Sequence, residues 1–169
     1  GAILGQSRVE SGETETAGEL HDRLAADGAT LVPKVVGELA RGESREIVQE
    51  ESQATLAPKL KREIAKLDWT KSARELACWI RGLSPWPGVH VKLLDMEGKE
   101  VVRMGLLRAR AVGEARSEPS VIGDGGLVGT SDLGGLEILE VQPEGKRPMP
   151  LAAFKNGHPW QAGMRLESI

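Results

Sequence analysis

The chain has 169 residues, a formal net charge of −3 and 40% apolar residues, a composition that excludes a wholly disordered protein. It has no Tyr and only one Phe, which disfavours an RNA-binding sheet built on stacked aromatic side chains. Its single cysteine, Cys78, excludes an internal disulfide and a cysteine metal cluster, and we expect a buried, unreactive thiol. No apolar run is long enough to cross a bilayer, so we expect a cytoplasmic protein without membrane contact.

Acidic and basic residues are distributed unevenly along the chain. Residues 1–58 hold five Lys or Arg against eleven Asp or Glu, whereas residues 59–169 hold 17 against 14. A change of sign at one point of a chain indicates two units with different partners. The polar stretch Gln49–Gln53 has no apolar period and predicts a linker near this boundary.

The first segment predicts two helices. Thr16–Glu19 has the pattern of a capping box, and Gly28 is expected to end the first helix. An apolar stripe over Leu31–Leu39 predicts a second helix that ends at Gly42, with Pro33 tolerated only in its first turn. Two amphipathic helices cannot close a core alone, so they indicate the end of a larger αβ domain.

The second segment begins with a further helix. A capping box at Ser72 and Glu75 predicts its start, and the proline-rich run Pro85–Gly88 follows its end. Three side chains at helical spacing are expected to pack the core: Leu76, Trp79 and Ile80.

Beyond Gly88 the apolar period changes to two, which is typical of strands. Strands are predicted at residues 89–93, 101–112, 120–122, 127–130 and 136–141, with a short helix opening at Pro150. Short strands joined by tight glycine turns favour a small antiparallel β-barrel over residues 68–169.

Residues suited to catalysis or metal binding are not grouped in the sequence. The three histidines are far apart, and none has a second ligand at metal-binding spacing: His21, His90 and His158. Gly123–Gly126 predicts a hairpin turn, because neither a helix nor a Lys-Ser/Thr pair follows it.

Basic residues carry more information. Clusters occur at Lys59, Lys61 and Arg62 and at Lys146-Arg147, and three arginines lie on one predicted strand: Arg103, Arg108 and Arg110. Small antiparallel barrels often present such residues to a nucleic-acid backbone. The alternative interpretation is that these are ordinary solvated surface charges.

Several runs of the sequence resemble methionyl-tRNA formyltransferase. They are Thr16–Leu24, Gln49–Leu60 with its Ala-Pro-Lys-Leu ending, Leu67–Ala73, Ile80–Gly88, Gln142–Met149 and Phe154–Gly157. The runs follow one another in the family's order and extend over nearly the whole chain. The Trp-Pro-Gly run at 86–88 and the Pro-Glu-Gly-Lys-Arg-Pro-Met run at 143–149 are the most specific.

The resemblance implies an α+β chain of three parts. Residues 1–47 resemble the end of a Rossmann-like formyltransferase domain, residues 48–67 an interdomain linker, and residues 68–169 a small antiparallel barrel of OB-like, oligonucleotide-binding type. The family transfers a formyl group from 10-formyltetrahydrofolate to initiator methionyl-tRNA through an Asn, a His and an Asp near a Ser-Leu-Leu-Pro signature.

None of these catalytic residues can be assigned to a position of this chain. Gly1–Leu4 resembles the strand that follows the catalytic Asp, and no Met precedes Met96, so we expect the catalytic half upstream. The chain alone is then expected to be a monomer that is inactive and binds neither the folate nor a metal.

The resemblance implies initiator methionyl-tRNA as the partner. Six residues are its candidate backbone contacts: Lys59, Lys61, Arg62, Arg81, Lys146 and Arg147. Two alternatives stay open: a stand-alone RNA-binding or interaction barrel that has lost its catalytic domain, and the barrel of another folate-dependent formyltransferase. The linker and the run at 143–149 disfavour the second alternative.

Overall fold

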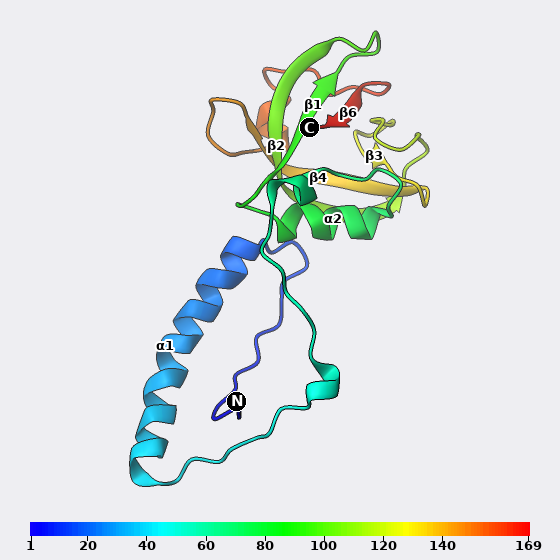
Figure 1. Ribbon diagram of the computed structural model, residues 1–169. Helices are drawn as coiled ribbons and strands as arrows, with labels where there is room; N and C mark the ends of the chain where they lie inside the picture. Colours follow the sequence, from blue (N-terminus) through cyan, green and yellow to red (C-terminus); the bar gives the residue numbers. More distant parts are fainter. The chain divides into compact units, whose positions relative to one another are not determined.

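The computed structural model describes residues 1–169 (Figure 1). The chain divides into two compact units. The first unit comprises residues 1–12 and 18–59, and the second comprises residues 13–17 and 60–169.

The first unit is built on helix α1, Ala17–Arg41. An antiparallel bridge joins Ile3 to Ile47, with two backbone hydrogen bonds of 2.8 and 2.9 Å. Gly5 permits a close approach of the amino-terminal segment to the helix, because a Cβ at this position would lie 2.5 Å from Cγ2 of Val35. No residue of α1 is buried, and a single-turn 3₁₀ helix, η1 at Glu51–Gln53, follows in an exposed stretch.

The prediction of two helices over this segment was wrong, because α1 is continuous through Gly28 and Pro33. Gly28 does not take the positive φ that a glycine stop requires, and an interior glycine costs only about 1 kcal/mol relative to alanine. Gly42 does end the helix: its φ is +71°, its N–H donates to Leu39, and the N–H of Glu43 donates to the carbonyl of Glu38. This pair of bonds is a Schellman motif.

The second unit is an antiparallel half-barrel with short helices. Its elements in chain order are η2 (Arg62–Ala65), α2 (Ala73–Gly82), β1 (Val89–Leu94), β2 (Glu100–Glu114), β3 (Val128–Gly129), β4 (Gly134–Pro143), β5 (Met149–Pro150), α3 (Leu151–Phe154) and β6 (Arg165–Ser168). The sheet order is β3-β4-β2-β1-β6, and β5 pairs with β4. The expectation of an antiparallel sheet with a few helices is therefore confirmed; β5 and β6 were not predicted.

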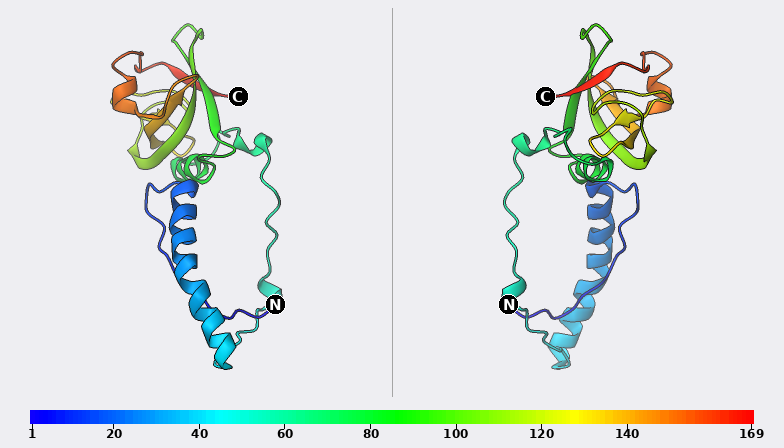
Figure 2. Two further views of the ribbon diagram at one scale, coloured as in Figure 1. Left: turned by 90° about the vertical axis from the view of Figure 1, so that its left-hand side faces the viewer. Right: turned by 90° about the vertical axis from the view of Figure 1, so that its right-hand side faces the viewer.

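The long strand β2 curves through the sheet (Figure 2). Its first half pairs with β1, from Glu100 to Leu106, and its second half pairs with β4, from Met104 to Glu114. Register shifts at Leu106/Arg108, Arg108/Ala109 and Val112/Glu114 interrupt the pairing with β4. Such bulges bend a strand and increase its twist. The bent strand β2 can therefore pair with β1 along one part of its length and with β4 along another.

The segment 119–123 connects the two edge strands. The N–H of Ser120 donates to the carbonyl of Gly129 in β3, and the N–H of Leu166 in β6 donates to the carbonyl of Ser120, both at 2.9 Å. Ile122 and Met164 add a 2.8 Å bond at the same edge. The predicted strand at 120–122 is thus a series of isolated bridges, and these satisfy backbone groups that open edges would leave unpaired.

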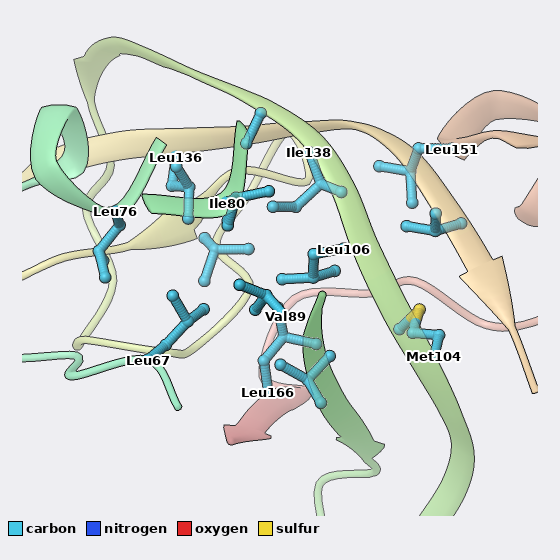
Figure 3. Packing of buried hydrophobic residues seen from close by; sticks show 14 of the residues in the cluster. Leu67, Leu76, Ile80, Val89, Met104, Leu106, Leu136, Ile138, Leu151 and Leu166 are labelled. Atoms are coloured by element: carbon cyan, nitrogen blue, oxygen red, sulfur yellow. The ribbon is translucent and has the colours of Figure 1, made fainter. Parts of the chain in front are cut away.

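The core lies between α2 and the concave face of the sheet (Figure 3). Ile80 and Leu106 are fully buried, and Leu76 is 2% exposed. The capping box predicted at Ser72 and Glu75 is confirmed, with both reciprocal hydrogen bonds present. Trp79 was wrongly expected in this core: it is 48% exposed on the outer side of α2.

No helix of this structure combines the length and the apolar character needed to cross a membrane.

Candidate nucleic-acid interface

The predicted basic residues at the start of the second unit lie on and beside η2. Lys61 and Arg62 are exposed, whereas Ala65 and Leu67, a few residues later, are buried in the core. The indole N–H of Trp79 donates to the carbonyl of Ile64 at 2.7 Å, which ties η2 to α2. Lys61 and Arg62 therefore lie on a short segment that is held in place by burial of the residues after it and by the hydrogen bond from Trp79. Lys59 is also exposed and belongs to the first unit.

The second predicted cluster, Lys146-Arg147, lies in the turn between β4 and β5. The N–H of Lys146 donates to the carbonyl of Pro143 at 2.9 Å, and Gly145 supplies the positive φ of +72° that the turn needs. The side-chain amide of Gln142 donates to the carbonyl of Lys146 at 3.0 Å. Both cationic side chains are exposed on this constrained turn.

Two adjoining surface hollows lie in the second unit. The Trp86 hollow, of about 450 Å³, is lined by Arg62, Ala65, Trp86, Pro87, Gly88, His90 and Ile169. The Arg103 hollow, of about 330 Å³, is lined by His90, Arg103, Met104, Gly105, Ile169 and the stretch Gln142–Gly145. Because both share His90 and Ile169, Arg62 borders one end of a continuous depression, and the turn that carries Lys146 borders the other.

Ion pairing separates the basic residues into two groups. The arginines of β2 are paired with carboxylates: Arg103 with Glu100 at 2.8 Å, Arg108 with Glu140 at 3.4 Å, and Arg110 with Glu137 at 2.6 Å. The side-chain hydrogen bond that Arg103 donates to Glu100 raises the pKa of Arg103 above its ordinary value, and the bond that Arg110 donates to Glu137 does the same for Arg110.

Five of the six predicted contact residues have no carboxylate partner: Lys59, Lys61, Arg62, Lys146 and Arg147. Their charges are therefore not neutralised within the chain and remain able to meet a polyanion.

Arg81, the sixth predicted contact, differs from the others. It is half-buried, and its guanidinium donates to the carbonyl of Ala109 at 2.8 Å, which joins α2 to β2. It also lies 3.6 Å from the sulfur of Cys78. The expectation of a buried thiol was wrong, because Cys78 faces outward on the exposed side of α2.

The histidines occupy separate environments. His21 is exposed in the first unit beside Asp22, and His158 stacks on Phe154 with ring centroids 4.4 Å apart. His90 lies at the junction of the two hollows. Trp86 and His90 are surface features that sequence reasoning did not assign to the interface; the Trp-Pro-Gly run was the available signal, but it served there only as a helix terminator and family marker.

Residues 59–159 match the family model described as the formyl transferase C-terminal domain. The chain is 37% identical to a methionyl-tRNA formyltransferase of Bacillus cereus (strain G9842), and 36% identical to those of Bacillus thuringiensis (strain Al Hakam) and Bacillus anthracis (strain CDC 684 / NRRL 3495).

Each of these alignments covers 98% of this chain and 52% of the relative, so the chain spans about half the length of the curated relatives it matches. The resemblance drawn from the sequence runs is thereby confirmed. The chain belongs to the family of the formyl transferase C-terminal domain.

Proposed function

We propose that this chain is the tRNA-holding part of a methionyl-tRNA formyltransferase. The observation that carries the proposal is the set of exposed cations without carboxylate partners, of which Arg62 lines the Trp86 hollow and Lys146 follows Gly145, which lines the Arg103 hollow. The relatives named above are methionyl-tRNA formyltransferases, and this supports initiator methionyl-tRNA as the polyanion.

The chemistry of the proposed contact is phosphate neutralisation. A Lys or Arg that meets a phosphate releases condensed counterions, so affinity depends on salt concentration. The turn at Lys146-Arg147 is already fixed by the bonds of Pro143 and Gln142, which lowers the conformational entropy lost on binding. Phosphate contacts of this kind position a nucleic acid without reading its sequence.

The proposal also assigns roles to the two units. The second unit serves as an OB-like barrel, and the first unit is the end of a Rossmann-like formyltransferase domain. Formyl transfer from 10-formyltetrahydrofolate is assigned to an Asn, a His and an Asp that lie outside this chain, so the folate is bound there as well.

The test is a titration of methionyl-tRNA with the chain at two salt concentrations. The interface variant changes Lys59, Lys61, Arg62, Lys146 and Arg147 to Ala. The control variant also removes three lysines and two arginines, all exposed and without ion pairs: Lys71, Arg74, Lys99, Arg116 and Lys155. Both variants lose the same net charge, so a general electrostatic effect changes them equally.

We expect the interface variant to bind tRNA more weakly than the control variant. The slope of log K against log salt should become shallower by roughly 0.7–0.9 for each phosphate that the variant no longer neutralises. Equal affinities and equal slopes for the two variants would refute the proposed interface.

A further inference from the structure

We propose that the Trp86 hollow binds one unpaired nucleotide of RNA, with its base stacked on the indole of Trp86 and its phosphate against Arg62. This inference rests on the proposed function and specifies how part of the RNA is held. It adds to the phosphate contacts a site that recognises a base.

Trp86 differs from the other three tryptophans because it neither packs against the core nor makes a hydrogen bond within the chain. Trp160 is 8% exposed and donates to the carbonyl of Gly126, Trp79 donates to Ile64, and Trp69 packs against the core. Trp86 lies outside the core, is 57% exposed, and makes no hydrogen bond within the chain. An exposed indole in a hollow is a stacking surface, since every base has a π-face.

His90 lines the same hollow as Trp86, and its imidazole lies against two glycines. A Cβ at Gly88 would lie 3.1 Å from Nε2 of His90, and a Cβ at Gly105, opposite His90 on β2, would lie 3.7 Å from Nδ1. The ring therefore rests over backbone that carries no side chain. Neither ring nitrogen has a hydrogen-bond partner within the chain. One nitrogen of a neutral imidazole donates and the other accepts, which suits the polar edge of a base.

The distribution of charge places the phosphate at the Arg62 side of the hollow. Arg62 lines the hollow without a carboxylate partner, whereas Arg103, across His90, is neutralised by two hydrogen bonds with Glu100. The hollow's volume of about 450 Å³ lies within the range of roughly 300–1,000 Å³ typical of small-ligand sites. The hollow thus combines the aromatic face of Trp86, the imidazole of His90 and the guanidinium of Arg62. This combination matches an unpaired nucleotide rather than a duplex, because the bases of a duplex are already stacked on one another.

A single indole also fits the composition. The scarcity of aromatic residues disfavours a sheet that stacks several bases, but a single indole in a hollow suffices for one base. The proposal therefore assigns one nucleotide to the Trp86 hollow.

The experiment compares W86A and W86F with the unchanged chain. The probes are a labelled single-stranded adenine octanucleotide and an RNA duplex of the same length. We expect W86A to weaken single-strand binding by about 5- to 150-fold, W86F to retain most of it, and duplex binding to change less than about two-fold. R62A should make the single-strand salt slope shallower by about 0.7, whereas W86A should leave this slope unchanged.

A second measurement needs no destabilising change. The indole N–H resonances of the unchanged chain are followed by NMR during addition of the octanucleotide, with each signal assigned from a single Trp→Phe variant. The Trp86 signal should shift, while that of buried Trp160 should not. Unchanged single-strand affinity in W86A, or an unmoved Trp86 signal, would overturn the stacking site.

The two proposals fail separately. If the interface variant described above loses tRNA affinity while W86A retains single-strand affinity, the phosphate interface stands and the stacking site is wrong. If W86A loses single-strand affinity while the interface and control variants bind tRNA equally, the stacking of a base on Trp86 stands, and the phosphate contacts, including that of Arg62, are wrong.

Discussion

Trp79 donates its indole N–H to the backbone carbonyl of Ile64 at 2.7 Å, although the two residues are fifteen positions apart. The bond connects the exposed side of α2 to the 3₁₀ turn that carries Arg62. The indole thus positions a segment of the proposed interface rather than filling the core. Its helical spacing with Leu76 and Ile80 conceals this role.

The first prediction concerns this bond. W79F keeps an aromatic ring but removes the donor, so the free energy of unfolding should fall by about 1 kcal/mol, measured by urea denaturation. W86F is the matched control, because Trp86 makes no hydrogen bond within the chain, and its stability should stay within about 0.5 kcal/mol of the unchanged chain. Equal stabilities of the two variants would show that the Trp79 bond contributes nothing.

The second prediction separates Arg81 from the other predicted contacts. Its guanidinium bonds to the carbonyl of Ala109, and hydrogen bonds to charged groups contribute about 1.5–3 kcal/mol. R81A should therefore lower the free energy of unfolding by about 2 kcal/mol, whereas R62A should leave it nearly unchanged. For tRNA binding, R62A should make the slope of log K against log salt shallower, whereas R81A should leave this slope nearly unchanged. A shallower slope in folded R81A would instead assign Arg81 to the interface.

The third prediction is a dependence of stability on pH through Asp132. The hydrogen bond from Thr130 lowers the pKa of this carboxyl below 3.8, with further contributions from the N–H groups of Ala73 and Gly134. A lowered folded-state pKa means that the stabilisation is complete above the unfolded value of 3.8 and is lost as the pH falls through the folded value.

Urea unfolding of D132N, followed from neutral pH into this acidic range, tests the assignment. D132N should be less stable at neutral pH and should lose less stability on acidification than the unchanged chain. D124N serves as the control, because Asp124 is exposed and accepts no hydrogen bond within the chain. Parallel pH curves for D132N and the unchanged chain would contradict the prediction.

The fourth prediction concerns activity. The purified 169-residue chain, supplied with 10-formyltetrahydrofolate and methionyl-tRNA, should form no formylated product above a reaction without enzyme. Formyl transfer needs a group that accepts the proton of the amine and donors that stabilise the developing oxyanion. In this chain His158 is stacked on Phe154, His21 is exposed in the first unit, and His90 has no carboxylate partner.

A full-length relative, such as the Bacillus cereus enzyme, provides the positive control in the same assay. Product formation by the chain alone would show that it contains a catalytic group that the proposed function places elsewhere.

Local signals in the sequence were sufficient for much of the second unit. The capping box at Ser72 and Glu75 and the alternation over Val89–Leu93 depend on neighbours within a few residues, so both were predicted at nearly the observed positions. The turn at Lys146 was predictable for the same reason, since Gly145 and Pro148 constrain the backbone directly.

Local signals failed elsewhere in the chain. Gly28 and Pro33 are tolerated inside α1, so two local breakers did not end the helix. Strands as short as β5 and β6 form because they pair with β4 and β1. Two to four residues are too few to show an apolar period, so the sequence does not predict these strands. The same holds for the exposure of Trp79, which follows from its bond to Ile64.

For the proposed interface, the sequence by itself determined which residues carry positive charge and that two clusters of them exist. Only the tertiary structure decided which charges remain available. Arg108 and Arg110 of β2 pair with Glu140 and Glu137 of the neighbouring strand β4, and Arg103 pairs with Glu100 on its own strand. It also placed His90 between Gly88 and Gly105, joining two hollows into one depression. The physical reason is that ion pairing between strands and surface shape depend on distances across the sheet, and strand pairing sets those distances.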